Sequence, residues 1–155
     1  VNHKFKFGSV WCEVAGGDIY FTGGFQSKQV FRVSGSSLDV TQKAGMLNAR
    51  AGHGSLYDEN YLYAIGGWNP ISTRECERLS GSEDRWEALP PLPQACYHVS
   101  VVVVKETECL YALGGANRYP KYLDVIQRLR LGRLEWDVMP LRLPNAAGSI
   151  ACFSK

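Results

Sequence analysis

The sequence predicts an all-β protein that consists of about three similar units, each a four-stranded antiparallel sheet. Three observations favour this fold class. A hydrophobic run that contains a tyrosine ends in two glycines three times, beginning at Gly23, Gly66 and Gly114. A tryptophan follows two of these pairs at a similar distance. Short runs rich in β-branched and aromatic residues alternate with clusters of Gly, Pro, Asn and Asp, without helical periodicity.

Each predicted unit contains the same elements in the same order. The glycine pairs begin 43 and 48 residues apart. Trp86 and Trp136 occupy matching places in the second and third units, where the first unit has Val40. Four strands in this length are typical of one blade of a β-propeller. We therefore expect blades at about 4–44, 50–90 and 96–140, with the start of a further blade at 145–153.

The composition is that of a globular protein with nearly balanced charge. Of the 155 residues, 45% are hydrophobic and 21% are charged, and the net charge is +2. This balance gives no reason to expect nucleic acid or an acidic membrane as the main partner. The longest apolar run, at 99–104, is far shorter than the about 20 residues that a membrane-spanning helix needs.

The five cysteines, at positions 12, 76, 96, 109 and 152, form no Cys-x-x-Cys motif. Small secreted scaffolds usually carry a denser and even set of cysteines. We therefore interpret these residues as reduced thiols that pack in the core, which favours a cytoplasmic or nuclear location.

The repeated pattern resembles the kelch repeat, in which an apolar run ends in Gly-Gly and a tryptophan and a proline-containing link follow. The resemblance covers about residues 4–153 and is weakest in the first unit, where Val40 replaces the tryptophan. The glycines allow a positive φ and a close backbone approach. The tryptophan fills the space between blades, and its polar tip can find a partner. Proline in the links at 90–93 and 140–144 cannot sit in a central strand.

The resemblance implies a propeller, but a closed propeller has about four to eight blades and this chain accounts for about three. The two terminal blades would then each have an uncovered apolar face. We therefore expect additional blades outside this segment, or self-association.

The sequence shows no catalytic or metal-binding pattern. His3, His53 and His98 fall in different units without the spacing of metal ligands. No phosphate-binding loop and no local nucleophile–histidine arrangement occurs. We interpret His53 and His98 as independent loop residues near the rim of the central channel, and we expect no cofactor.

The resemblance also implies where a partner would bind. The binding residues would lie in the loops that follow Gly-Gly and in the links that enter the innermost strands. Arg50 matches an arginine that is frequent in the family, whereas Cys96 and Ala147 do not match it. Trp, Tyr and Arg often anchor interfaces. The predicted partner-binding residues are Phe25, Gln26, Arg50, Trp68, Asn69, Tyr97, His98, Asn117, Arg118 and Tyr119.

The expected function is therefore non-catalytic binding of a protein or peptide on one face of the propeller. One form of this function is the substrate-recognition propeller of a ubiquitin-ligase adaptor. Two alternatives remain open at the level of sequence, namely an actin-associated cytoskeletal scaffold and a fragment of a propeller enzyme of the oxidase or sialidase type.

Overall fold

The computed structural model describes residues 5–14 and 16–148 of the chain. His3, Lys4, Cys152 and most of the further strand expected at 145–153 lie outside these residues. Among the described residues, no helix is long and apolar enough to cross a membrane.

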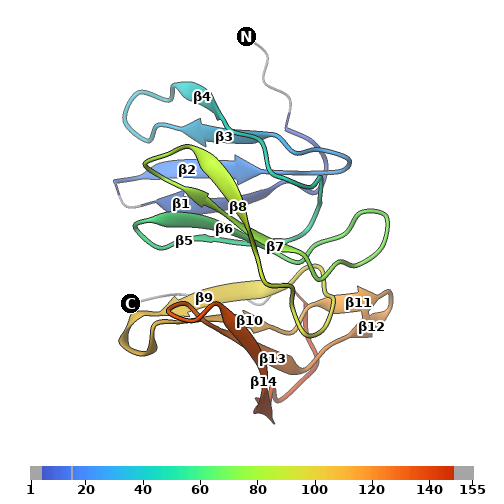
Figure 1. The fold of residues 1–155 in the computed structure, drawn as a ribbon. Helices are drawn as coiled ribbons and strands as arrows, with labels where there is room; N and C mark the ends of the chain where they lie inside the picture. Colours follow the sequence, from blue (N-terminus) through green and yellow to red (C-terminus); the bar gives the residue numbers. More distant parts are fainter. Residues whose placement is uncertain (1–4, 15, 149–155) are drawn as a thin grey trace.

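Three four-stranded antiparallel sheets follow one another along the chain and stack face against face (Figure 1). In each sheet the strands lie side by side in chain order, from the innermost to the outermost, as in a propeller blade. The first sheet contains β1 (Val10–Val14), β2 (Asp18–Thr22), β3 (Val30–Val33) and β4 (Val40–Lys43). The second contains β5 (Gly54–Tyr57), β6 (Tyr61–Ile65), β7 (Cys76–Ser80) and β8 (Arg85–Leu89). The third contains β9 (Ser100–Val104), β10 (Cys109–Leu113), β13 (Val125–Arg130) and β14 (Glu135–Arg142). The predicted all-β propeller fold is thus confirmed.

One hydrophobic core lies between each pair of neighbouring sheets. The core between the first and second sheets includes Tyr20, Val30, Leu62 and Trp86. The core between the second and third sheets is larger, and Ile65, Leu110 and Leu129 within it are fully buried. Both faces of the second sheet are therefore buried. Its strands β6 and β7 accordingly show nearly continuous burial rather than the alternation of a half-exposed strand.

The Gly-Gly pairs perform the same task in all three sheets. The first glycine of each pair has a φ between +63° and +65°, and the second has a φ between +89° and +114°. A Cβ on Gly66 would lie 2.4 Å from the carbonyl oxygen of Cys96, at the start of the next sheet. The N–H of Gly67 donates to that same oxygen at 2.8 Å. Glycine is required here because the backbone of the next sheet occupies the space of a side chain, as the sequence predicts.

The tryptophans also recur as predicted. Nε1 of Trp86 donates to the carbonyl oxygen of Ala44, and Nε1 of Trp136 donates to that of Pro90, both at 2.8 Å. Each indole therefore packs between sheets and binds the link that leaves the preceding sheet. Val40 lies opposite Val33 in the register where Trp86 lies opposite Leu79, so it does occupy the tryptophan position.

The structure differs from the sequence prediction in three details. A single 3-10 turn (η1, Lys105–Thr107) connects β9 and β10. The expected loop after the third Gly-Gly pair contains a short hairpin, β11 (Ala116–Arg118) and β12 (Lys121–Tyr122). Pro140 was expected in the link but lies inside β14, because an outermost strand does not need its N–H for pairing.

The four cysteines in the described part of the chain are buried and form no disulfide, which agrees with the prediction of core thiols. Burial raises the pKa of Cys12 and Cys76 to about 11 and that of Cys96 to about 12. These thiols are therefore protonated and unreactive at neutral pH.

Candidate functional site

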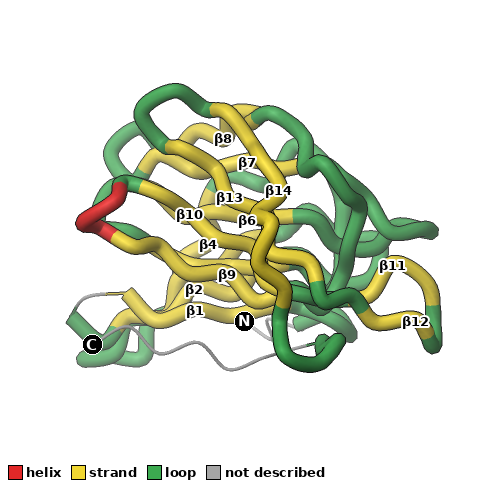
Figure 2. The backbone as a smooth tube through the Cα atoms, turned by 90° about the horizontal axis from the view of Figure 1, so that it is seen from below, coloured by secondary structure: helices red, strands yellow, loops and turns green. Residues whose placement is uncertain are grey.

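The ends of the strands define two opposite faces of the molecule. The Gly-Gly face consists of the loops that follow the glycine pairs and of the links that enter the innermost strands. The turn face consists of the tight turns at the other strand ends. Figure 2 shows the β11–β12 hairpin at one end of the strands and the η1 turn at the other. The Gly-Gly face comprises residues 5–9, 23–29, 44–53, 66–75, 90–99, 114–124 and 143–148, and the turn face comprises 16–17, 34–39, 58–60, 81–84, 105–108 and 131–134.

All ten predicted partner-binding residues lie on the Gly-Gly face, but they differ in exposure. Six are exposed, three are partly buried, and one is buried. The exposed residues are Phe25, Gln26, Asn69, His98, Arg118 and Tyr119, the intermediate ones are Trp68, Tyr97 and Asn117, and Arg50 is buried.

Phe25 and Trp68 form an aromatic platform that bridges the first two sheets. Their rings stack with centroids 5.7 Å apart and an interplanar angle of 24°. Two backbone hydrogen bonds to Ala51, at 2.9 and 3.1 Å, fix the main chain of Trp68. Neither side chain must be ordered on binding, so contact with a partner would cost little conformational entropy.

The third sheet contributes the β11–β12 hairpin, which projects from the stack of sheets (Figure 1). Its first strand pairs with the link at Tyr97, because Tyr97 and Ala116 exchange hydrogen bonds of 2.8 Å. Arg118 and Tyr119 lie at its tip, and the Tyr119 side chain is 80% exposed. A large aromatic side chain held in solvent at the turn of a paired hairpin is suited to anchor a partner.

Arg50, in contrast, is a buried structural residue. Its side chain is 1% exposed, and Nη2 lies 2.6 Å from Oε1 of Glu77, which is equally buried. Nη1 donates to the carbonyl oxygens of Gly66 and Glu75 at 2.9 and 2.7 Å. The carboxylate of Glu77 also accepts the N–H groups of the preceding link, including that of Leu47 at 2.6 Å. This packing argues against direct contact between Arg50 and a partner, and we leave it out of the proposed surface.

The third repeat replaces this ion pair by a neutral arrangement. Cys96 occupies the position equivalent to Arg50. The N–H of Gly24 donates to the carbonyl oxygen of Arg50, and the N–H of Gly67 donates to that of Cys96. Gln127 stands in the place of Glu77, because both lie opposite the second-last residue of the neighbouring strand. Its Oε1 accepts the N–H of Gln94 at 2.7 Å and thus still holds the link. Loss of the cation is therefore matched by loss of the anion.

His53 and His98 lie in different surroundings, as the sequence interpretation of two independent residues requires. His53 is buried between the first two sheets rather than at the channel rim, with Nε2 2.7 Å from Oγ1 of Thr22. His98 is exposed and has a φ of +51° at the place where the earlier links have Gly8 and Gly52. Its N–H donates to the carbonyl oxygen of Gly52, as that of Gly52 does to Gly8. A histidine with a positive φ, at a position that is glycine in the earlier links, has a strained backbone. Such strain favours a role in binding at the surface over a role in packing.

We expect the stability of the protein to fall in mild acid because of His53. Burial and the nearby charge of Arg50 lower the pKa of His53 to about 3, whereas an unfolded histidine has a pKa of about 6.5. Protonation of His53 therefore favours the unfolded chain. Its contribution to the free energy of unfolding is constant above about pH 6.5 and is about 2 kcal/mol lower at pH 5. Urea titrations between pH 7 and 5 would measure the loss.

The matched variant for this measurement is His53→Val, because Val99 occupies the same place in the third repeat. It should lose most of the pH dependence, whereas His98→Gly should retain it. An unchanged pH dependence in His53→Val would show that another group titrates.

The two faces also differ in hydrophobicity and in charge. Among the described residues, the large hydrophobic side chains exposed on the Gly-Gly face are Phe7, Phe25, Leu47, Ile71, Tyr119 and Tyr122, and the turn face exposes Leu38 alone. The described Gly-Gly face carries Lys6, Lys28, Arg74, Arg118 and Lys121 against Glu75 and Asp124, apart from the buried Arg50 that Glu77 neutralises. The described turn face carries Asp39, Asp58, Glu59, Glu83, Asp84, Glu106 and Glu108 against Lys105 and Arg133. The small net charge of the chain therefore conceals two faces of opposite sign.

This segregation adds residues that the sequence analysis missed. Lys28, Ile71 and Arg74 belong to the same loops as the predicted residues but lie further from the glycines. The signal that could have found them is in the sequence, since basic residues follow the glycine pairs and acidic residues occupy the other turns.

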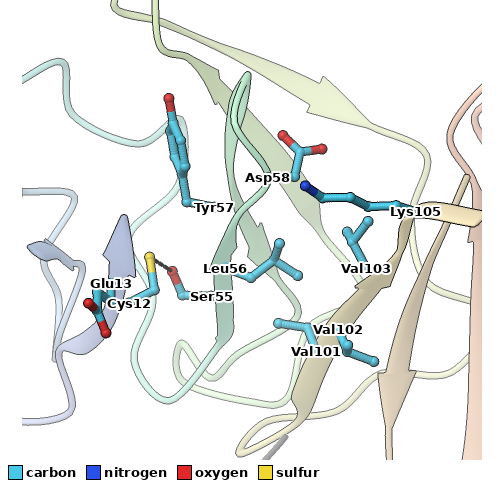
Figure 3. Close-up of a pocket in the computed structure, with 10 residues that line it drawn as sticks. All are labelled: Cys12, Glu13, Ser55, Leu56, Tyr57, Asp58, Val101, Val102, Val103 and Lys105. Carbon is cyan, nitrogen blue, oxygen red and sulfur yellow. Dashed lines mark hydrogen bonds between the residues drawn. The ribbon is translucent and has the colours of Figure 1, made fainter. Parts of the chain in front are cut away.

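A pocket lies against the innermost strands β1, β5 and β9 and has a volume of about 420 Å³ (Figure 3). Most of its polar groups are already engaged, Glu13 excepted. Ser55 donates to the Cys12 thiol at 3.6 Å, and Asp58 accepts the hydroxyl of Tyr63 at 2.8 Å. Lys105 is paired with Glu59. This pocket offers no activated nucleophile, and among the described residues Glu13 is its one charge without an ion pair or a side-chain hydrogen bond.

Across the part of the chain that the structure describes, no three His, Cys, Asp or Glu side chains gather where they could hold a metal ion. The Gly-Gly face is therefore the stronger candidate site, and the chemistry that it offers is contact through aromatic and cationic side chains.

Comparison with known proteins gives relatives for this chain. The kelch motif matches residues 49–93. Kelch-like protein 25 of Xenopus tropicalis is 27% identical over 135 residues, which cover 77% of this chain and 23% of that protein. Kelch-like protein 35 of Mus musculus is 30% identical over 123 residues, 78% of this chain and 21% of the relative. Kelch-like protein 25 of Homo sapiens is 27% identical over 144 residues, 80% of this chain and 22% of the relative.

The chain thus spans about a fifth of the length of these curated relatives. The match to the kelch motif coincides with the second sheet, in which the Gly-Gly pair, Trp86 and the proline link all occupy the places described above. The third sheet repeats the Gly-Gly pair and the tryptophan, and the first sheet repeats the Gly-Gly pair with Val40 at the tryptophan position. This chain belongs to the kelch-repeat β-propeller family.

Proposed function

We propose that this chain is a non-catalytic interaction module that holds a partner protein or peptide on its Gly-Gly face. The observation that carries the proposal is the unequal distribution of exposed hydrophobic side chains, which gather on this face and are nearly absent from the turn face. Aromatic residues in a polar and cationic surround are typical of interface anchors. The similarity to Kelch-like proteins supports the same conclusion.

The proposed contact residues are the Phe25–Trp68 platform, the side chains of Tyr97 and His98, and the hairpin tip with Arg118 and Tyr119. Gln26, Asn69 and Asn117 would add hydrogen bonds from the same loops. The platform and the hairpin belong to different sheets, so a partner that contacts both would span more than one blade.

Affinity capture followed by mass spectrometry tests this proposal. Truncation of an interface anchor typically costs about 2 kcal/mol or more, so Trp68→Ala and Tyr119→Ala should each weaken partner capture by about 30-fold. Leu38→Ala is the matched control, because Leu38 is 74% exposed on the turn face. Arg50 variants are unsuitable, since they would disturb the fold. Partner capture that survives both aromatic variants but fails with Leu38→Ala would move the site to the other face.

We propose further that the whole protein acts as a cytoplasmic adaptor that presents its partner to a ubiquitin ligase. This step rests on the family resemblance, and the buried, unpaired thiols agree with a reducing compartment. Depletion of the protein should raise the abundance of the captured partner and lower its ubiquitination. Unchanged ubiquitination together with co-sedimentation on actin filaments would instead favour the scaffold alternative.

Additional blades remain part of this proposal. The outward side of the first sheet presents Phe5 stacked on Phe21, with ring centroids 4.3 Å apart, and β14 at the other end presents Val138 and Leu141 to solvent. Exposed apolar sheet faces of this kind need cover, so we propose that further blades or another copy of the chain pack against them.

A further inference from the structure

The outward side of the first sheet carries a row of aromatic side chains that runs across its strands. Trp11 lies opposite Phe21 in the register, and Phe21 lies opposite Phe31, so all three side chains point to the same side of the sheet. Phe5 stacks on Phe21 and meets Phe31 edge-on, with ring centroids 4.3 and 5.8 Å apart. Trp11 is 63% exposed and Phe5 is 45% exposed. This aromatic row therefore forms an apolar surface at one end of the stack of sheets (Figure 1).

The other two sheets have different residues in this row, on the side that packs against the preceding sheet. The residues in the same register are Ser55, Ala64 and Glu77 in the second sheet and Val101, Ala112 and Gln127 in the third. The two alanines are fully buried in the cores between the sheets. Phe21 therefore occupies the position at which both junctions between sheets have an alanine.

Two side-chain contacts that hold the preceding link are also missing from the first sheet. Glu77 and Gln127 accept N–H groups of the links before them, whereas Phe31 has no acceptor at this position. The two core tryptophans donate to those links through Nε1, whereas Val40 has no donor. A regular blade that docked here would lose both contacts and would meet bulky aromatic side chains. The aromatic row thus suits a different neighbour.

The opposite end of the stack keeps the features of a junction between blades. The N–H of Gly115 donates to the carbonyl oxygen of Ala147 at 2.8 Å, as that of Gly67 does to Cys96. The third sheet therefore holds its link in the same way as the second sheet does. A head-to-tail contact between two copies would place this regular end against the aromatic row, which lacks the groups that hold such a link.

The charges of the first sheet are separated along its strands. Lys6 and Lys28 lie at the Gly-Gly end, whereas Glu13 and Asp39 lie at the turn end. Among the described residues, none of these four side chains makes an ion pair. A second copy with its strands in the same direction would bring like charges together, whereas a copy with reversed strands would bring cations beside anions. Charge complementarity therefore favours a reversed second copy.

We propose that the aromatic row is the interface of a homodimer with two-fold symmetry. The axis runs along the row and across the strands, so each aromatic side chain meets its own counterpart and the strands of the two copies run in opposite directions. Lys6 then faces Glu13 of the second copy, because both lie at the ends of β1. One self-complementary surface is enough for such a contact. The inference specifies the cover proposed above for this end of the stack, and partner capture on the Gly-Gly face does not depend on it.

Sedimentation velocity of the full chain over a series of concentrations tests the dimer. Trp11→Ser introduces the residue of the second sheet at an exposed position. It should raise the dissociation constant of the dimer by about 30-fold or more, because symmetry applies the change twice. Leu141→Ser is the matched control, since Leu141 is 68% exposed on β14 at the other end of the stack, and it should leave the dimer unchanged. A chain that stays monomeric, or a dimer that persists in Trp11→Ser, would overturn the proposal.

Charge reversal tests the direction of the second copy. Lys6→Glu and Glu13→Lys should each weaken the dimer by about 5- to 10-fold, and the double variant should restore it to within about 2-fold. A double variant that remains as weak as the single ones would overturn the reversed arrangement. Trp68→Ala should leave the dimer intact. Loss of partner capture in that variant with an intact dimer, or the converse in Trp11→Ser, would show that the two surfaces act separately.

Discussion

An Arg50→Cys variant should lose about 3–5 kcal/mol of its free energy of unfolding, because it leaves the carboxylate of Glu77 buried without its cation. The two side chains are each 1% exposed and lie 2.6 Å apart, so neither charge can turn to solvent. Burial already raises the pKa of Glu77 above its ordinary value, with Arg50 opposing that shift. Urea denaturation at pH 7 would measure the loss.

The third repeat suggests how to rescue this variant. Arg50→Cys combined with Glu77→Gln reproduces the pair Cys96 and Gln127, in which a neutral amide holds the link. The double variant should therefore be more stable than the sum of the two single losses predicts, by about 1–3 kcal/mol. Glu87→Gln is the surface control, since its ion pair with Arg78 is partly exposed and should contribute less than about 1 kcal/mol. Additive losses in the cycle would show that the two side chains act independently.

A Gly66→Ala variant should lose about 3–4 kcal/mol through two separate effects. The backbone at Gly66 has a φ of +63°, which costs a residue with a side chain about 1–2 kcal/mol. The new Cβ would also lie 2.4 Å from the carbonyl oxygen of Cys96, so the next sheet must shift, at a cost typical of overpacking.

Two other glycines separate these effects. Gly16 has a φ of +98° but nothing within 4 Å of a new Cβ, so Gly16→Ala should show only the backbone cost of about 1–2 kcal/mol. Gly132 has neither a positive φ nor a close neighbour, so Gly132→Ala should change stability by less than about 0.5 kcal/mol. Thermal or urea unfolding of the three variants would test the ranking. Equal losses in Gly16→Ala and Gly66→Ala would show that the contact with the next sheet does not matter.

The fold could be predicted because its determinants are local and repeated. The glycine pair, the tryptophan and the link each act through one residue type at one position, and three copies in phase make a chance match implausible. The hairpin at 116–122 could not be predicted, because its strands are too short to show a period of two. Pro140 was misplaced because proline is excluded from central strands but tolerated in an outermost one.

The candidate site could be predicted only in part. Its loops directly follow the glycine pairs, so the exposed aromatic residues in them could be predicted from the sequence. The burial of Arg50 was not, because its partner Glu77 is 27 residues away and the surrounding carbonyl oxygens come from separate segments. The opposite charge of the two faces was also not predicted, because the composition gives only the net charge of the whole chain. It emerges once each loop is assigned to an end of a strand.

The contacts that recur between neighbouring repeats have a consequence for how such a chain can change. The indole of Trp86 binds a main-chain carbonyl of the preceding link, and Gly67 binds a main-chain carbonyl of the following one. The side-chain pairs Arg50 with Glu77 and Cys96 with Gln127 each lie inside one repeat. Hydrogen bonds to backbone atoms do not depend on the side chains of the neighbour, so only the apolar core between the sheets has to match. A repeat can therefore be duplicated or exchanged whole by recombination, carrying its own matched residues, while its loops diverge toward new partners.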